Sequence, residues 1–420
     1  MTAARREAAR GFTLVELMVA ISGGLFMSVI VFMMARDGSR FYQRESRVAD
    51  ATLASVVGFE RLRGDLARAS FMASPNVRRD PALCQTIDAS WPAGLKHLAG
   101  VRISTPAAPN ATLSANGLQP DSIDLAGAYD SVDEFPMWGV TDGGTTYSVA
   151  LQSAIGPLAR MGYSAATDQV GLLRQVFKPG RALRIVDRSG RVQYGTIQSV
   201  SVTSGVPTVV LSNQPKLTFR TSDATPCGIR LNETGYVNVV NFIRYEVKSL
   251  SSSTRFAPLY TNAADVPFEA HRTELVRTEL DTSGAPITGD TENTEELVAE
   301  YAVDLKFGVT VVNNVTGGTD PALATYLAGN AQIGNYAGDT NALTPPNGPQ
   351  RIRAIRVRLA VRSREADRQG NISDSSGTFP TGVAPGLYRV GLGAGATAPF
   401  ARVRTLQADV SLPNQLGVLW

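Results

Sequence analysis

A single carboxylate lies in the longest apolar stretch of the chain. A charged group is costly in such a stretch, so it indicates a chemical role. Glu16 lies near the start of a run of apolar residues from Phe12 to Ala35. On insertion scales, an unpaired carboxylate at the centre of such a run costs roughly 2.5–3.5 kcal/mol. Residues of this kind are treated as functional and should have a cationic partner. The chemistry expected at Glu16 is therefore ion pairing.

The other reactive groups show no arrangement typical of an enzyme. The chain has two cysteines and two histidines, and the histidines, His97 and His271, are isolated in sequence. The patterns HExxH, CxxC, GxSxG and GxxxxGK[ST] are absent from the sequence. Asp281 and the acidic run Asp290–Glu296 are candidates for calcium binding, but they lack EF-hand spacing. We therefore expect no catalytic residue, no cofactor and no metal site.

The apolar run that carries Glu16 is long enough to cross a membrane. As a helix, residues 12–35 reach about 36 Å, compared with a hydrocarbon layer of about 30 Å. A secretory signal peptide fits less well, because its apolar region has about 7–15 residues and ends at a cleavage site of small residues. A plain anchor is not clearly oriented by the positive-inside rule, because more arginines follow the run than precede it.

Length, composition and net charge exclude further classes of protein. The chain has 420 residues, of which 43% are hydrophobic, and this excludes a disordered chain. A polytopic membrane protein is excluded because only one apolar run could span a bilayer. The net charge of +3 is too small to indicate a nucleic-acid-binding protein by itself.

After Ala35 the sequence becomes amphipathic up to Ser70. The stripe alternates spacings of four and three residues, as on one face of a helix: Val48, Thr52, Ser55, Phe59, Leu62, Leu66 and Ala69. We predict one helix from about Phe12 to Ala69, with Arg61 and Asp65 paired on its polar side. The stripe is short and poor in Leu and Ile for a coiled coil. It is therefore expected to pack on the protein's own β-sheet.

Beyond Ser70 the pattern changes to alternating or short apolar runs bounded by turns, which is typical of strands. We predict strands at Ser122–Ala126, Tyr147–Leu151, Ala182–Asp187, Val192–Val202, Thr208–Leu211, Val237–Lys248, Leu297–Val312, Ile352–Val361 and Ala401–Leu412. Asp187–Gly190 is expected to form a hairpin turn. Asn313–Gln350 reads as a long exposed loop with one short helix at Pro321–Ala328. The expected fold class is α+β, a long helix with an antiparallel sheet.

One predicted strand carries a dense cationic face. Apolar side chains alternate along Ile355–Val361, and the opposite face holds Arg356, Arg358, Arg362 and Arg364. One interpretation is a solvated outer face. The other is an interface for an acidic neighbour, because arginine pairs with carboxylates in a bidentate manner. The acidic run Asp290–Glu296 is a candidate partner, within the fold or between subunits.

The residues around Glu16 resemble the class III signal of type IV prepilins: Gly11-Phe12-Thr13-Leu14-Val15-Glu16, after a short basic leader. The resemblance implies that a membrane prepilin peptidase cuts between Gly11 and Phe12 and methylates the new amino group of Phe12. It also implies that Glu16 faces the α-amine of Phe12 on an adjacent subunit and sets assembly register. Electrostatics favours this pairing of carboxylate and amine, because poorly solvated opposite charges attract strongly.

Several later segments resemble the PilW family of minor pilins, in the same order along the chain. They are Pro120–Asp130, Phe177–Val202, Asn241–Ser249, Ala257–Thr261, Glu296–Val309, Arg351–Glu365 and Arg402–Asn414. Two features depart from the family: the ending SLPNQLGVLW, and the region Ser131–Gln175, which looks like an insertion. The implied fold is type IV pilin-like, with the long N-terminal helix packed on an antiparallel sheet in an enlarged, loop-rich C-terminal domain.

The resemblance also implies a domain plan. Residues 1–11 are the leader, 12–35 the transmembrane and filament-core helix, 36–70 its amphipathic continuation, and 71–420 the globular β-rich domain with insertions. After export, Cys84 and Cys227 would lie in an oxidising periplasm, where a disulfide between them is expected. Two unrelated free thiols are the alternative.

The function implied is that of a non-enzymatic minor pilin in an inner-membrane priming complex for pilus assembly, which then stays near the pilus tip. The implied partners are other minor pilins, the major pilin, the prepilin peptidase, the inner-membrane assembly platform, a large tip adhesin and, before assembly, membrane lipid. Nucleic acid is not an expected partner. Two alternatives remain: a minor pseudopilin of a type II secretion system, similar to the J component, and a tip adhesin or DNA-capture pilin. The arginine face at 356–364 motivates the latter.

Overall fold

The structure is a computed structural model that describes residues 13–106, 110–221, 227–253, 255–260, 272–287, 294–313, 322–338, 347–364, 387–390 and 400–418. The chain divides into two compact units, Met1–Asp50 and Ala51–Trp420, and each is described by itself. The predicted leader, Gly11, Phe12 and His271 lie outside the described residues.

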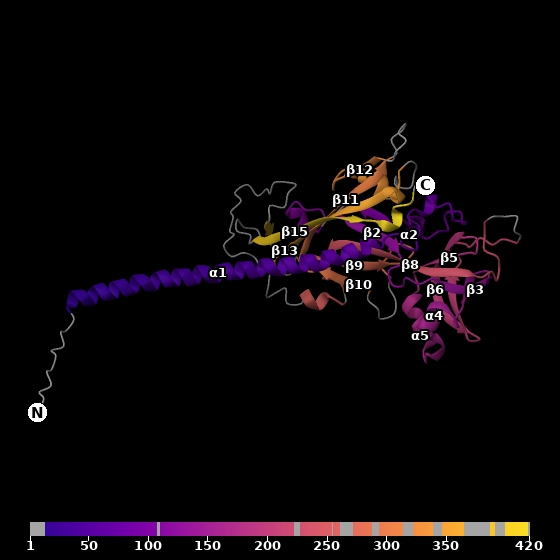
Figure 1. The fold of residues 1–420 in the computed structure, drawn as a ribbon, viewed down its shortest axis with the longest axis horizontal. Coiled ribbons are helices and arrows are strands. Elements are labelled where there is room, and N and C mark those ends of the chain that lie inside the picture. The colour runs from indigo at the N-terminus through magenta and orange to yellow at the C-terminus, as the bar shows by residue number, and fades with distance from the viewer. Residues whose placement is uncertain are drawn as a thin grey trace, which may run out of the picture. The chain divides into compact units, whose positions relative to one another are not determined.

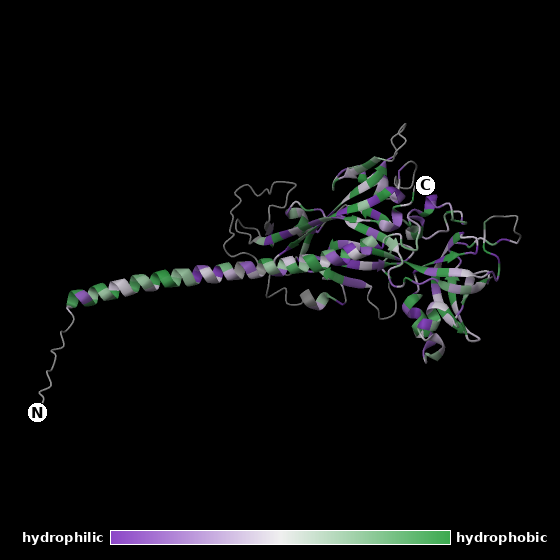
Figure 2. Cartoon of the chain, viewed as in Figure 1, coloured by the Kyte–Doolittle hydropathy of each residue, from purple (hydrophilic) through white to green (hydrophobic). Residues whose placement is uncertain are grey.

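Helix α1 runs from Leu14 to Ala67, so the single long helix predicted from Phe12 to Ala69 is confirmed over its described part. Its first residues, within Met1–Asp50, are apolar and exposed on all sides. Figure 2 draws this stretch largely in the green of hydrophobic residues. A helix whose side chains are apolar on every face needs apolar surroundings. The residues of this unit do not cover these side chains by themselves.

The second unit contains a first antiparallel sheet in which the strands follow the order β1, β2, β8, β9 and β10. Figure 1 labels β2, β8, β9 and β10 of this sheet. Their bounds are Val101–Ser104, Ser122–Gly127, Gly235–Lys248, Glu274–Leu280 and Glu295–Ala299. Strand β8 is the central strand, and its second half pairs with β2 on one side and β9 on the other.

The first half of β8 belongs to a closed barrel. Its strands follow the order β3, β4, β7, β6 and β5, and β8 pairs with both β3 and β5, which closes the ring. The other bounds are Phe135–Asp142, Thr146–Leu151, Val206–Ser212, Val192–Thr203 and Ala182–Val186. The interior is filled by buried apolar side chains, with helices α4 (Gly156–Arg160) and α5 (Gln169–Val176) packed on them. The region Ser131–Gln175, expected to be an insertion, therefore supplies strands that complete this barrel.

A second antiparallel sheet has the order β12, β11, β13, β15 and β14. The bounds are Ala322–Tyr326, Ala302–Asn313, Ile352–Arg362, Phe400–Ser411 and Leu387–Arg389. The short helix predicted at Pro321–Ala328 is wrong, because Ala322–Tyr326 pairs with Val309–Asn313 as a strand. Cross-strand pairing outweighs the weak local helix preference of this segment. The remaining helical turns are α2 (Ala93–Lys96), α3 (Ala111–Ala115), α6 (Ile333–Ala337), and short 3₁₀ turns at Val77–Arg79, Tyr163–Ala165, Ala257–Tyr260, Pro349–Arg351 and Pro413–Gln415.

The chain passes from the first sheet to the second at Tyr301. The strand predicted at Leu297–Val312 is split here, because β10 pairs with β9 and β11 pairs with β13. Tyr301 has a left-handed φ of 56°, and its N–H donates to the buried Glu274 carboxylate at 2.7 Å. The guanidinium groups of Arg272 and Arg362 lie 4.6 and 4.7 Å from the Tyr301 ring centroid. These contacts from distant strands fix a turn that the local apolar pattern does not show.

The helix residues from Ala51 onward pack into the core that both sheets share, as the stripe predicted. Phe59, Leu62, Leu66 and Ala69 are buried in one cluster with apolar residues of both sheets. Thr52 is exposed and Ala51 is buried in its place. The larger departure is Asp65, predicted on the polar side and in fact buried.

Gly58 of α1 lies close to Ala299 of β10, and its replacement is a direct test of this packing. A Cβ at Gly58 would lie 2.6 Å from the Cβ of Ala299, whereas a Cβ at Gly64 would meet nothing within 4 Å. We expect Gly58→Ala to destabilise the protein by about 1–3 kcal/mol through overpacking. Gly64→Ala is expected to stabilise it by roughly 0.5–1 kcal/mol through helix propensity. Thermal denaturation of both variants measures the difference, and shifts of the same sign would contradict the packing.

Candidate functional site

At the start of α1, Thr13 and Glu16 are hydrogen-bonded to each other. The Thr13 backbone N–H and its hydroxyl both donate to Oε2 of Glu16 at 3.0 Å. In return, the Glu16 backbone N–H donates to the Thr13 hydroxyl oxygen at 3.3 Å. This reciprocal arrangement is a capping box, and it satisfies amide groups that the start of a helix leaves without partners.

The capping box gives Glu16 a local structural role that our sequence reasoning missed. The signal was present, because Thr-x-x-Glu before an apolar run is the sequence pattern of this cap. A carboxylate in the first turn also interacts favourably with the positive end of the helix dipole. Both hydrogen bonds end on Oε2, and among the described residues no donor reaches Oε1. Glu16 can therefore cap its own helix through Oε2 and still accept a hydrogen bond from another group at Oε1.

The surface that follows Glu16 is suited to an apolar environment. Leu14–Tyr42 is, among the described residues, the one helix segment that is long and apolar enough to cross a membrane. Its 29 residues would extend about 44 Å as a helix, more than the hydrocarbon thickness of about 30 Å. The hydroxyls of Ser22 and Ser28 donate to Val19 and Gly24 carbonyls of the same helix, so they need no outside partner.

Within the second unit, a buried ionic group ties α1 to the first sheet. Oδ2 of Asp65 accepts from the Tyr245 hydroxyl at 2.7 Å and from Arg277 Nε at 2.8 Å. Burial, reinforced by the charge of Asp65, raises the pKa of Tyr245, which keeps its hydroxyl protonated as a donor. Glu296 extends the network to the surface by pairing with Arg277 and Arg61. Part of the predicted acidic run therefore serves within the fold, while Asp290–Asn293 lies outside the described residues.

The C-terminal segment holds the end of α1. The Asn414 amide nitrogen donates to the carbonyls of Ala67 and Ala69 at 3.2 and 3.1 Å. Gln415 donates to the hydroxyl of Ser70, which has a left-handed φ of 62°. The two Asn414 bonds satisfy carbonyls that a helix end leaves free. The unusual ending noted in the sequence thus contains the residues that anchor the helix.

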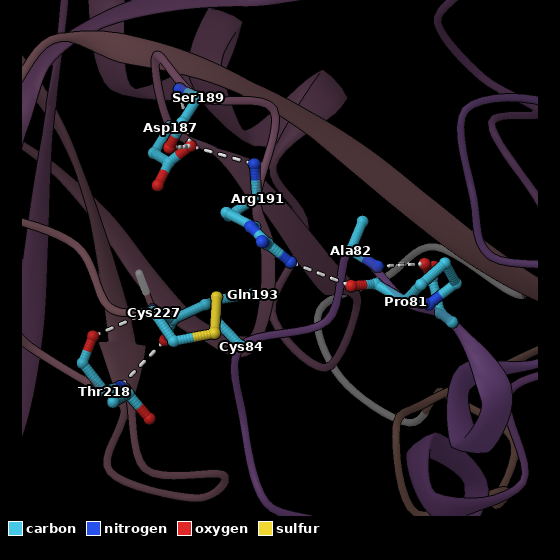
Figure 3. The surroundings of a disulfide bond; sticks show 10 residues. Pro81, Ala82, Cys84, Asp187, Ser189, Arg191, Gln193, Thr218 and Cys227 are labelled. Atoms are coloured by element: carbon cyan, nitrogen blue, oxygen red, sulfur yellow. Dashed lines mark hydrogen bonds between the residues drawn. A yellow bond between two sulfur atoms is a disulfide. The ribbon is translucent and has the colours of Figure 1, made fainter. Parts of the chain in front are cut away.

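A disulfide between Cys84 and Cys227 is present, as predicted, with a Cα–Cα distance of 5.1 Å. Figure 3 shows Arg191 donating to the carbonyl of Pro81, near Cys84, and Gln193 of β6 hydrogen-bonded to Thr218, on the side of Cys227. The Cys84 N–H donates to the carbonyl of Val192, and the Gln193 amide exchanges two hydrogen bonds of 2.8 Å with the backbone of Thr218. The disulfide therefore joins the segment before β1 to the loop after β7.

Removing this disulfide should lower stability strongly. Cys84 and Cys227 are 143 residues apart in sequence, and chain entropy predicts a loss of roughly 5 kcal/mol at most. We expect a Cys84→Ser/Cys227→Ser variant to melt at a lower temperature than the oxidised protein. Reductant should lower the melting temperature of the native protein and leave that of the variant unchanged. Equal melting temperatures for the two proteins under oxidising conditions would contradict this expectation.

The predicted arginine face is partly neutralised within the second sheet. Arg356 makes a bidentate pair with Asp409 of β15 at 2.7 and 2.8 Å, and its hydrogen bond lowers the pKa of Asp409. Arg358 pairs with the buried Asp304 at 2.9 Å. Burial raises the pKa of Asp304, and the charge of Arg358 opposes this effect. These pairs leave less positive charge for an outside partner than the sequence indicated.

Arg362 departs from the predicted face. It is only 2% exposed and lies over the rings of Tyr301 and Tyr388. Its Nη1 donates to the carbonyls of Ser363 and Arg364. Arg364 itself is exposed. Arg362 is therefore a structural residue at the passage between the sheets, and an interface role stays a prediction for Arg356, Arg358 and Arg364.

The acidic residues considered for calcium do not gather into a site within the described ranges. No group of three or more His, Cys, Asp or Glu side chains among those residues has an arrangement that could hold a metal ion. Oδ1 of Asp281 instead accepts from the backbone and hydroxyl of Ser283 and from the backbone of Ala285, and so stabilises its own turn.

Comparisons with known proteins return no match. No family model matches the chain, no curated protein is similar to it at a significant level, and no solved structure matches it.

Proposed function

We propose that this protein is a minor pilin of the PilW family. It is cut between Gly11 and Phe12, methylated on Phe12, and held in the inner membrane by α1 with its β-rich unit in the periplasm. It joins other minor pilins in a complex that primes assembly of a type IV pilus, and it stays near the tip. The observation that carries the proposal is the carboxylate of Glu16, the last residue of the prepilin-like signal, set in the first turn of an exposed apolar helix.

The geometry of Glu16 supports a role between subunits as well as within one helix. The capping box holds the carboxylate at the start of the helix, where the new α-amine of a mature chain would also lie. Oε1 accepts no hydrogen bond among the described residues. An ionised carboxylate has about four acceptor positions. It can therefore bind the ammonium group of a neighbouring Phe12 without losing its own cap.

A second feature supports lateral packing beyond the membrane segment. Leu53, Val56 and Val57 are exposed on α1, while Phe59 and Leu62 of the same helix are buried against the sheets. The exposed residues form a small apolar stripe with i, i+3 and i+4 spacing. A filament in which helices pack side by side would cover this stripe, so one helix could serve the fold and the assembly at once.

Processing at Gly11 gives the first test of the proposal. When the protein is produced together with a prepilin peptidase, we expect a mature mass that begins at Phe12 and carries one added methyl group. Gly11→Val is expected to keep the leader, because the peptidase of this family cuts after glycine. Intact mass spectrometry of both membrane-extracted proteins is the measurement. A native protein that keeps its leader, or that is cut elsewhere, would contradict the proposal.

A further inference from the structure

The barrel exposes two large aromatic side chains next to each other. Trp138 is 57% exposed and Tyr236 is 52% exposed. Trp138 lies in β3 where the register with β4 shifts between Met137 and Gly139, which is a β-bulge. Bulges re-aim side chains and are common beside functional sites. Tyr236 of β8 is directly opposite Pro136, so Trp138 and Tyr236 are diagonal neighbours on the outer face.

Two loops extend this surface. The turn before β8 lies on β3, since a Cβ at Gly139 would be 2.5 Å from Cα of Asn232, and the adjacent Leu231 is exposed. On the other side, a Cβ at Gly156 would be 3.2 Å from the ring of Pro136, and the adjacent Ile155 is exposed. We call the following residues the aromatic patch: Pro136, Trp138, Ile155, Leu231 and Tyr236.

A cation borders the aromatic patch. Arg188 lies at the tip of the β5–β6 hairpin and donates from Nε to the Thr234 hydroxyl, two residues before Tyr236, at 2.9 Å. The turn is rigid, because Asp187 accepts from the backbone of Ser189 and Arg191. Among the described residues, no carboxylate oxygen lies within 4 Å of the Arg188 guanidinium. Its charge is therefore held next to Thr234, at the edge of the aromatic patch, and has no carboxylate partner within the described residues.

The exposed side chains of the aromatic patch are not part of the buried cluster that fills the barrel. The barrel interior is filled by other residues, among them Phe135 and Met137, which alternate with the exposed positions of β3. Clustered exposed apolar side chains on a soluble surface mark interaction sites. Trp, Tyr and Arg are the residues most enriched among those that dominate protein–protein binding energy. The aromatic patch and the bordering Arg188 bring these three residue types together on the barrel.

We propose that the aromatic patch, with Arg188, docks an acidic segment of another subunit of the assembly. Charge complementarity selects the occupant: Arg188 supplies at the rim one positive charge that no described carboxylate pairs with, and the aromatic rings supply apolar area at the centre. The matching segment presents an Asp or Glu beside an apolar side chain. This inference rests on the proposed function for the nature of the partner, while the patch and its charge stand independently of it.

The test places a photo-crosslinking amino acid at position 138 of the full chain in cells. We expect ultraviolet light to join it to one pilin-like protein of the same cell, at a peptide that contains Asp or Glu. Arg188→Glu in the same chain should reduce the adduct by about tenfold or more, the size of effect expected at a binding hot spot. Reversing the charge of the mapped partner residue should restore the adduct.

Two controls separate the possible results. The same amino acid at position 323, where Leu323 is 68% exposed on β12 of the other sheet, should give no such adduct. Leader cleavage of each variant verifies production and reports on the proposed function separately. A processed protein with no adduct at position 138, an adduct with a glycan or lipid, or one that Arg188→Glu does not reduce would overturn the docking proposal.

Discussion

Replacing Glu16 with alanine is expected to remove the protein from sheared filaments by more than about tenfold while leaving it in the membrane. Loss of one partner from a buried ion pair costs about 3–5 kcal/mol, and each 1.4 kcal/mol corresponds to a factor of about ten in an equilibrium. Membrane insertion should persist, because the apolar segment Leu14–Tyr42 is unchanged otherwise. The measurement is quantitative immunoblotting of sheared filaments and membranes from the same cells.

The capping box allows the two roles of Glu16 to be separated with matched variants. Glu16→Gln keeps an acceptor for Thr13, because glutamine also completes a capping box, but it removes the charge. Thr13→Ala removes the cap, at a cost of about 1 kcal/mol, and keeps the carboxylate. If Glu16 pairs with an ammonium group, Glu16→Gln should fail like Glu16→Ala, and Thr13→Ala should assemble nearly normally.

The opposite pattern would contradict ion pairing. If Glu16→Gln assembled like the native protein and Thr13→Ala failed, the carboxylate would act only through the helix cap seen in the structure. Normal filament levels for Glu16→Ala would contradict both roles. Each outcome is read in the full chain, with its leader, so processing by the peptidase can be checked on the same samples.

Replacing Asp65 with alanine is expected to give the largest loss of stability among substitutions in α1. Arg277 would lose its buried partner at 2.8 Å, and the Tyr245 hydroxyl would lose its acceptor. Removing one partner of a buried pair costs about 3–5 kcal/mol, and Arg277 would keep only its longer contact of 3.5 Å with the partly exposed Glu296. We expect a clearly lower melting temperature for the detergent-solubilised chain, measured by circular dichroism.

The nearby surface pair provides the matched control. Arg63 and Glu60 are in the same helix, are more than half exposed and form an i,i+3 pair. Glu60→Ala should change stability by no more than about 0.5 kcal/mol. A combined Asp65→Leu/Arg277→Leu variant should recover part of the stability lost by Asp65→Ala, since no unpaired charge remains. Equal effects of Asp65→Ala and Glu60→Ala would show that the buried network does not hold the helix.

Local patterns predicted the regular elements well. The stripe at four-and-three spacing predicted α1, and alternating apolar residues predicted most of the long strands, including β13, β8 and β15. The predicted turn at Asp187–Gly190 does join β5 and β6. These elements were readable because each buries one face, and the period of its apolar residues records which face that is. Short strands such as β1 and β14 carry too few residues for a period to be read.

The candidate site was predicted only in part. Glu16 was recognised because a charge in an apolar run is costly, while the cap by Thr13 was overlooked although its pattern is local. The aromatic patch could not be predicted, because Trp138 and Tyr236 lie in strands whose pairing is set by the barrel. A tryptophan in a strand is as compatible with a core position as with an exposed one.

The sequence by itself determined the long helix, the alternation of the main strands and the two cysteines available for a bridge. The tertiary structure decided which residues that are distant in sequence lie next to each other in space. Asp65 borders the apolar stripe, between Leu62 and Leu66, so its burial depended on Arg277 and Tyr245 reaching it from the sheet. Arg362 is buried because its guanidinium group packs over the rings of Tyr301 and Tyr388. A helical or strand period fixes the direction of a side chain, but only the packed partner decides whether a charge on that side can be buried.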